Sequence, residues 1–225
     1  KHLSVCRKTS NYSEYSINNT ILEHASSYLG VHITSDLSWR THIEHIISSA
    51  NRTLGYIKRN FYLVPLHLKL TLYKTLIRPK LEYGAAIWDP YQESLVHAIE
   101  AVQNRSARFI LGNYNRTASV SSMKSSLHIP PLSVRRKLSR LNLFHKIYHH
   151  NPSLKESLIL PPHYISRRVD NSQKVGIHRC ATTTFSESFI PRTSLQWNQL
   201  PSSLTSITDI TLFKKSVAIH YSASD

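Results

Sequence analysis

The sequence has 225 residues, of which 40% are hydrophobic and 18% are charged, a balance typical of a folded chain and not of a disordered one. Lysine and arginine total 28 against 13 acidic residues, and the net charge of +15 indicates a polyanionic partner. The five glycines argue against Gly-rich phosphate loops, the two cysteines against a disulfide framework or a four-thiolate zinc site, and the absence of a long apolar run against a membrane span.

Short apolar runs separated by polar breaks fill residues 1–35 and predict two or three antiparallel strands. The pair Asn18 and Asn19 lies between Ile17 and Ile21, where it favours a hairpin turn. Such a hairpin is marginal alone, so we expect it to pack against another part of the protein.

From Asp36 onward, apolar residues recur every three or four positions and predict a long helix over about 38–62, capped by Ser38 or Asp36. A second helix is expected to begin at Pro65 and to be kinked or ended by Pro79. Basic residues lie off the apolar stripes of both helices: Arg52, Lys58, Arg59, Lys69 and Lys74.

Further amphipathic helices are predicted over about 91–111, 118–127, 132–149 and 208–221. Residues 151–185 read as a loop with one strand near 178–185. The helix over 91–111 carries Arg105 and Arg108 off its apolar stripe. The helix over 132–149 is expected to have a basic face formed by Arg135, Arg136, Lys137, Arg140 and Lys146.

Residues that could carry catalysis are sparse. The five Asp and eight Glu are scattered and no two are adjacent, whereas two-metal phosphoryl transfer needs converging carboxylates. The chain is therefore predicted to lack catalytic residues. His42 and His45 are three positions apart, but a zinc site needs three or four converging ligands, so these histidines are interpreted as solvated or partly buried.

Several stretches resemble reverse transcriptases of non-long-terminal-repeat retrotransposons, the jockey-like LINE group. SYLGVHITSDLSWRTHI, residues 27–43, resembles the segment after the catalytic carboxylates, although Ser27 stands where that family often has Lys. LYKTLIRPKLEYGAAIWDP (72–90) and AIEAVQNRSARFILG (98–112) resemble the helical thumb. Residues 121–149 resemble the region beyond the thumb, and SFIPRTSLQWNQLP (188–201) resembles a carboxyl-terminal signature.

The resemblance implies a mainly α fold: the end of a palm with a primer-grip β-hairpin over 1–35, a helical thumb over 36–128, and a helical, loop-rich region over 129–225. It places the primer grip at Tyr28, Leu29, Gly30 and Val31. The parent protein would be an RNA-directed DNA polymerase. Its palm, fingers, catalytic Asp residues with their Mg²⁺, and an endonuclease domain would all precede Lys1, so this chain alone would be inactive and needs no cofactor.

The resemblance further implies that the chain binds an RNA template and a DNA primer or target inside an intracellular ribonucleoprotein, nuclear or cytoplasmic. Contacts to phosphates would not depend on base sequence, because a polymerase copies every sequence. The candidate contacts are Arg52, Lys58, Arg59, Lys69, Lys74, Arg105 and Arg108, with a second cluster of Arg135, Arg136 and Arg140. Replacing Lys58 and Arg59 should flatten the salt dependence of binding.

Two other readings fit the same charge pattern. A stand-alone basic helical module could bind nucleic acid with no enzymatic activity. A membrane-surface protein with basic amphipathic helices would also be cationic. The apolar stripes argue against the membrane reading, because they are expected to face a shared helical core.

Overall fold

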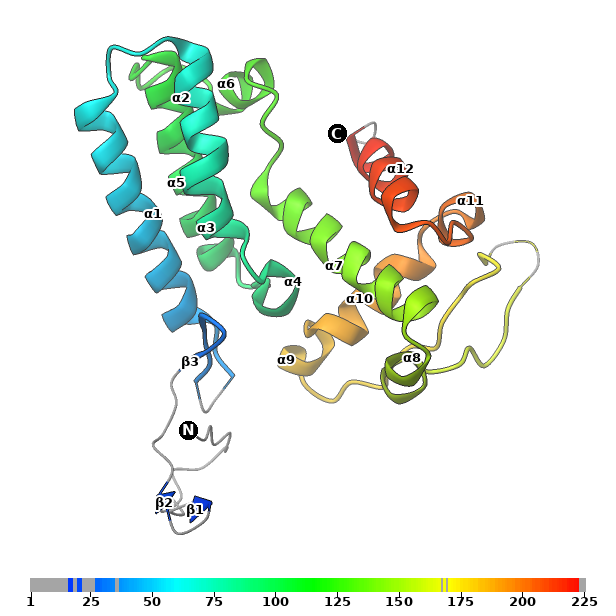
Figure 1. The fold of residues 1–225 in the computed structure, drawn as a ribbon. Helices are drawn as coiled ribbons and strands as arrows, with labels where there is room; N and C mark the ends of the chain where they lie inside the picture. The colour runs from blue at the N-terminus through cyan, green and yellow to red at the C-terminus, as the bar shows by residue number, and fades with distance from the viewer. Residues whose placement is uncertain are drawn as a thin grey trace. The chain divides into compact units, whose positions relative to one another are not determined.

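The computed structural model describes residues 16–17, 20–21, 27–34, 37–166, 168 and 170–222. These residues form mainly helices, preceded by short antiparallel hairpins, as the sequence predicts (Figure 1). The chain divides into two compact units. Unit 1 contains residues 1–84 and 92–129, and unit 2 contains residues 85–91 and 130–225.

The two described hairpins are each built from two-residue strands. Strand β1 (Ser16–Ile17) pairs with β2 (Thr20–Ile21) so that Ile17 faces Thr20, which confirms a hairpin at the predicted place. The predicted turn residues Asn18 and Asn19 lie outside the described residues.

Strand β3 (Ser27–Tyr28) pairs with β4 (Val31–His32) through the turn Leu29-Gly30. Both turn residues have positive φ, 47° at Leu29 and 81° at Gly30, as type I′ hairpin turns require. Gly30 is therefore a turn residue at the tip of this hairpin.

Helix α1 (Arg40–Asn60) agrees closely with the predicted range 38–62. It buries one stripe of side chains: His42, Ile43, Ile46, Ala50, Leu54 and Ile57. The expected cap by Ser38 or Asp36 is not the one observed, because Trp39 is the N-cap and makes no side-chain cap. Ser38 instead accepts a hydrogen bond from the N–H of Arg40 at 3.4 Å, and Asp36 lies outside the described residues.

The second predicted helix is divided into three segments. These are α2 (Leu66–Leu72), the π-helix η1 (Tyr73–Ile77) and α3 (Arg78–Glu82). Pro79 lies in the first turn of α3, where its missing N–H costs little. The π-helical turn η1 lies just before this proline and interrupts the α-helix there. This agrees with the expectation that Pro79 would kink or end the helix.

Helices α5 (Glu93–Leu111) and α6 (Val120–Ser126) complete unit 1. In this unit α5 packs against α1, α2 and α6. Helix α5 ends at Gly112, whose φ of 64° is left-handed. The N–H groups of Gly112 and Asn113 bond the carbonyls of Phe109 and Arg108, which is a Schellman cap that turns the chain into the following loop.

Unit 2 is also helical. Its elements are α4 (Ala85–Trp88), α7 (Leu132–His150), α8 (Pro152–Leu158), α9 (Thr183–Ser186), α10 (Phe189–Asn198), α11 (Ser202–Thr205) and α12 (Ile210–Ser222). The predicted strand near 178–185 is wrong, since α9 lies there and Thr182 caps it. Residues 85–91, which the sequence analysis included in the thumb, belong to unit 2, where α4 packs against α7. The assignment of the chain to a palm and a thumb stays a prediction.

Trp197 is fully buried in the core of unit 2. It packs with Phe144, Phe213 and other apolar side chains, and its indole N–H donates to the carbonyl of Gln173 at 2.9 Å. Among the described helices, none is long and apolar enough to cross a membrane.

Candidate nucleic-acid interface

Two predicted contacts, Lys58 and Arg105, are brought together on unit 1 by the packing of α1 against α5. Partial burial and the neighbouring charge of Arg105 lower the pKa of Lys58. Arg105 donates a hydrogen bond of 3.0 Å to the amide oxygen of Asn51. Within the described part of the chain no carboxylate pairs with either cation, so their mutual repulsion is not neutralised.

Tyr114, which the sequence did not suggest, completes this cluster. The Lys58 ammonium lies 5.6 Å from the centroid of the Tyr114 ring, close enough for a cation–π contact. Tyr114 is 59% exposed and belongs to the loop between α5 and α6. The only sequence signal for it was an aromatic residue in a polar loop that also carries Arg116.

Arg108 braces the Tyr114 loop. Its guanidinium donates to the carbonyls of Asn115 at 2.7 Å and Ala118 at 3.4 Å. The side chain of Asn115 accepts the N–H of Thr117 at 3.1 Å, which tightens the loop further. Because its Nη1 and Nη2 both donate to backbone carbonyls, Arg108 holds this loop in position.

The other predicted contacts on unit 1 are more dispersed. Arg52 and Arg59 are exposed on α1, and Lys74 is half-buried in η1. Lys69 on α2 places its ammonium 5.1 Å from the ring centroid of Phe109 on α5. The structure thus joins Lys58 with Arg105, and it shows no comparable cluster for these four.

The predicted primer-grip residues form the β3–β4 hairpin. Tyr28 and Leu29 are 68% and 73% exposed at its tip, whereas Val31 is buried. The Tyr83 hydroxyl donates to the carbonyl of Leu29 at 3.0 Å. A methyl group at Gly30 would lie 3.6 Å from Tyr83 Cε1, so this aromatic side chain supports the turn directly.

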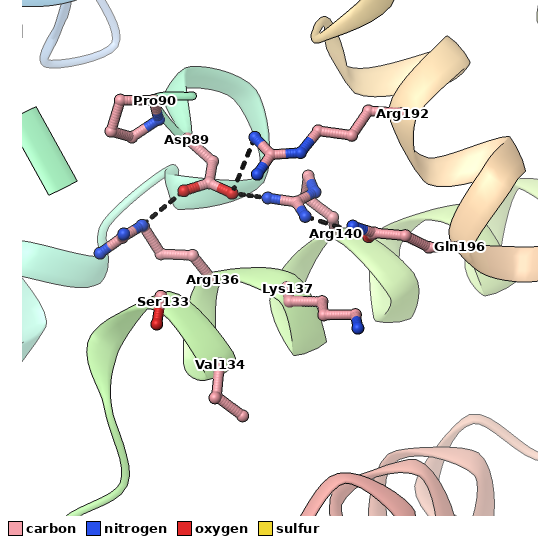
Figure 2. A pocket seen from close by; sticks show the side chains of 9 residues that line it. All are labelled: Asp89, Pro90, Ser133, Val134, Arg136, Lys137, Arg140, Arg192 and Gln196. Atoms are coloured by element: carbon pink, nitrogen blue, oxygen red, sulfur yellow. Dashed lines mark hydrogen bonds and ion pairs between the residues drawn. The ribbon is translucent and has the colours of Figure 1, made fainter. Parts of the chain in front are cut away.

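The second predicted basic cluster is organised differently from the sequence expectation. Arg136 and Arg140 on α7 have side chains only 1% and 3% exposed. Arg136 Nε donates to Asp89 Oδ1 at 2.5 Å, Arg140 contacts Asp89 Oδ2, and Arg192 on α10 lies 3.6 Å from the same oxygen (Figure 2). The prediction that Arg136 and Arg140 belong to an exposed basic face is therefore wrong. Arg135 is half-buried on α7.

This Asp89 cluster joins stretches that are far apart in the sequence. Asp89 comes from residues 72–90, Arg136 and Arg140 from 121–149, and Arg192 from 188–201. Each of these stretches had been singled out separately for its family resemblance. Arginines from two of these stretches thus contact a single carboxylate of the third inside unit 2.

Three histidines gather where β4 meets α1. The rings of His32 and His45 are 4.5 Å apart, and the backbone N–H of His32 donates to His42 Nδ1 at 3.2 Å. Burial, followed by the charges of His32 and His45, lowers the pKa of His42 to about 4. Among the described residues no three His, Cys, Asp or Glu side chains are arranged to hold a metal ion.

Part of the sequence is similar to a protein described as "Probable RNA-directed DNA polymerase from transposon X-element" of Drosophila melanogaster. The two are 32% identical over 94 residues, which cover 39% of this chain and 10% of that protein. The chain is related to a transposon reverse transcriptase. It spans about one tenth of the length of that relative. No protein-family model and no solved structure matches the chain.

Proposed function

We propose that this chain holds the template–primer duplex of an RNA-directed DNA polymerase of a non-LTR, jockey-like retrotransposon. The observation that carries the proposal is the Lys58–Arg105 pair beside exposed Tyr114, cations brought together without a carboxylate partner in the described chain. The partial sequence similarity to a transposon RNA-directed DNA polymerase supports the assignment to an enzyme of this kind.

The physical case rests on the phosphate backbone. A duplex phosphate that approaches Lys58 and Arg105 would screen their repulsion and release condensed counterions from the nucleic acid. Such contacts read no bases, and a polymerase that copies any template needs contacts of this kind. A fixed loop, held by Arg108, would keep Tyr114 in place beside the sugar–phosphate chain.

Within this proposal the β3–β4 hairpin acts as the primer grip. Its exposed tip, Tyr28 and Leu29, would approach the primer strand, and Gly30 would set the turn that presents this tip. Catalytic carboxylates with Mg²⁺ would be supplied by other parts of the polymerase. Arg52, Arg59, Lys69, Lys74 and Arg135 remain further candidates for phosphate contacts in the resulting ribonucleoprotein.

The test is fluorescence anisotropy of a labelled RNA–DNA hybrid titrated with the purified chain at several salt concentrations. K58Q/R105Q should reduce the slope of log affinity against log salt by about one to two, because about 0.9 counterion is released per phosphate contact. K214Q/K215Q is the matched control: it removes the same charge from exposed positions on α12 and should leave more of the slope in place. Equal slopes for the two variants would contradict the proposal.

A further inference from the structure

A small pocket in unit 2 lies beside the Asp89 cluster (Figure 2). It has a volume of about 190 Å³ and is lined from α7, from α10 and from the residues that follow α4. Its polar lining is mostly cationic: Arg136, Lys137 and Arg140 of α7 and Arg192 of α10, with Asp89 as the carboxylate. Ser133 and Gln196 add neutral polar groups.

The charges around this pocket do not balance. Asp89 is shared by three guanidinium groups, and Glu187, which lies 3.3 Å from Arg192 Nε, is the second nearby acid. Lys137 is a further cation at the lining, with its ammonium 3.9 Å from the ring centroid of Tyr221. Four cations therefore lie at or beside this pocket with only two carboxylates.

Several guanidinium donors also lack acceptors. Arg140 Nη2 donates to Gln196 at 3.0 Å and its Nη1 contacts Asp89, but no described residue accepts a hydrogen bond from its buried Nε. Arg192 Nη1 is buried and lies 3.6 Å from Asp89 Oδ2, which is too far for a hydrogen bond. Leaving such donors unmatched is costly, more so when they are charged.

The electrostatics of Arg140 agree with this geometry. Burial and the neighbouring charge of Arg192 lower the pKa of Arg140 to about 9, partly opposed by Glu187 and Tyr221. Burial also lowers the pKa of Arg192. Both guanidinium groups would be stabilised as cations by a further anion at the pocket.

We propose that this pocket binds a phosphate group, held by Arg140 and Arg192 with Lys137 and Ser133 at its edge. Planar guanidinium groups match phosphate oxygens in geometry, and the tetrahedral anion offers more acceptors than the shared Asp89 carboxylate. The pocket is smaller than the roughly 300 Å³ typical of small-molecule sites, which suits one phosphate group and not a whole nucleotide. This inference is independent of the unit 1 interface.

The experiment is a titration of the complete 225-residue chain with inorganic phosphate, at constant ionic strength set with chloride, followed by ³¹P NMR and calorimetry. We expect saturable binding with a Kd of about 1 mM or tighter. R192Q should weaken it at least tenfold, because it removes one of the two principal ligands. Arg192 is the less buried of the two, so its replacement should disturb the fold less than that of Arg140. R179Q, at an exposed arginine of the same unit, is the control and should bind as the wild-type chain does.

Two oligonucleotides of one sequence, with and without a 5′-phosphate, then distinguish the source of the group by competition. Competition by the phosphorylated strand alone indicates a terminal phosphate, competition by both indicates a backbone phosphate, and competition by neither indicates free phosphate. Each of these outcomes supports the pocket if R192Q removes the binding. Absence of saturable phosphate binding, or equal binding by R192Q and R179Q, would overturn the proposal.

A second variant separates binding from folding. D89N should lower the melting temperature, because it leaves the three guanidinium groups without their shared carboxylate. If the pocket takes phosphate, millimolar phosphate should restore more of that loss than chloride at equal ionic strength. R179Q, which keeps Asp89 and the pocket, should gain only the stability that phosphate binding gives the wild-type chain. The same melting temperature for D89N in both buffers would count against a phosphate site.

Discussion

The hydroxyl of Tyr83 donates a 3.0 Å hydrogen bond to the carbonyl of Leu29, and so attaches the tip of the β3–β4 hairpin to the residue that follows α3. Two-stranded hairpins are marginal without such support. This bond links the predicted primer grip to the helices of unit 1 from within the same unit.

Y83F should therefore loosen the hairpin without unfolding unit 1. The loss of one exposed hydrogen bond costs about 0.5–1.5 kcal/mol, expressed mainly as local opening. Amide hydrogen exchange at Val31 and Tyr28, which face each other in the ladder, should accelerate. The control is Y56F on α1, an exposed tyrosine, which should leave these exchange rates unchanged. Unaltered exchange in Y83F would show that the bond does not support the turn.

Replacing glycine by alanine should have opposite effects in the turn and in α1. G30A should destabilise the protein by about 1 kcal/mol, because alanine is strained at a φ of 81° although the methyl group has space. G55A should stabilise it by up to about 1 kcal/mol, because Gly55 lies inside α1, where a methyl group would make ordinary contact with Arg59. Denaturant unfolding measures both, and a stabilising G30A would contradict the turn geometry.

Acid should destabilise the fold through His42. Its pKa is lowered from 6.5 to about 4 by burial and by the charges of His32 and His45. As the pH falls, His42 is therefore protonated near pH 6.5 in the unfolded chain but only near pH 4 in the folded chain. The free energy of unfolding should fall as the pH decreases across this window, by at most about 3 kcal/mol for this group.

The variant H42N tests this effect by denaturant unfolding at pH 7 and pH 4. Burial also lowers the pKa of His145 and His149, so the variant should keep a smaller pH dependence and not lose it entirely. If H42N and the wild-type chain lose the same free energy between the two pH values, the assignment to His42 is incorrect.

Asn171 should be far less tolerant of aspartate than Asn113. The buried Asn171 amide donates to the carbonyls of Trp197, Asn198 and Leu200 at 3.1–3.2 Å. N171D would place a carboxylate against these carbonyls and should cost about 3 kcal/mol or more. In N113D the side-chain oxygen that accepts the N–H of Asn115 is kept, so the change should cost well under 1 kcal/mol. Thermal unfolding compares the two.

The helices of this chain were readily predicted where a core-facing stripe exists. The predicted range 38–62 compares with Arg40–Asn60, and 208–221 compares with Ile210–Ser222. Apolar residues that recur every three or four positions lie on one face of a helix, and that face is the one that packs against the core. The spacing therefore predicts both the helix and its buried side. The pairing of Ser16–Ile17 with Thr20–Ile21 was equally local, since only two residues separate the strands in the sequence.

The short helices α8 and α9 were missed because their starts are set by capping and not by periodicity. Asn151 accepts the N–H of Leu154 at 3.1 Å, with Pro152 at the first helical position. Thr182 accepts the N–H of Phe185 at 3.3 Å. The Asn-Pro pair is a recognised start signal, so α8 could have been found from the sequence.

The burial of Arg136 and Arg140 could not be found in this way. A helical wheel treats an arginine as a solvated residue, and their partner Asp89 lies 47 positions from Arg136. Only the tertiary packing of α4 against α7 brings the carboxylate to them. The pairing of Lys58 with Arg105 depends in the same way on α1 meeting α5, although both residues were already candidates.

Residues Ala85–Tyr91 belong to unit 2, although in the sequence they lie between two segments of unit 1, and this has a practical consequence. An expression boundary drawn at residue 130 would yield a polypeptide whose arginines have lost Asp89 and which lacks the fully buried Trp88. Unit 2 can therefore be expressed separately in its complete form only if residues 85–91 are fused to residues 130–225. Conversely, deleting residues 85–91 from the full chain would leave only Tyr83, Gly84 and Gln92 between α3 and α5, and should unfold a part of the protein that begins dozens of residues downstream.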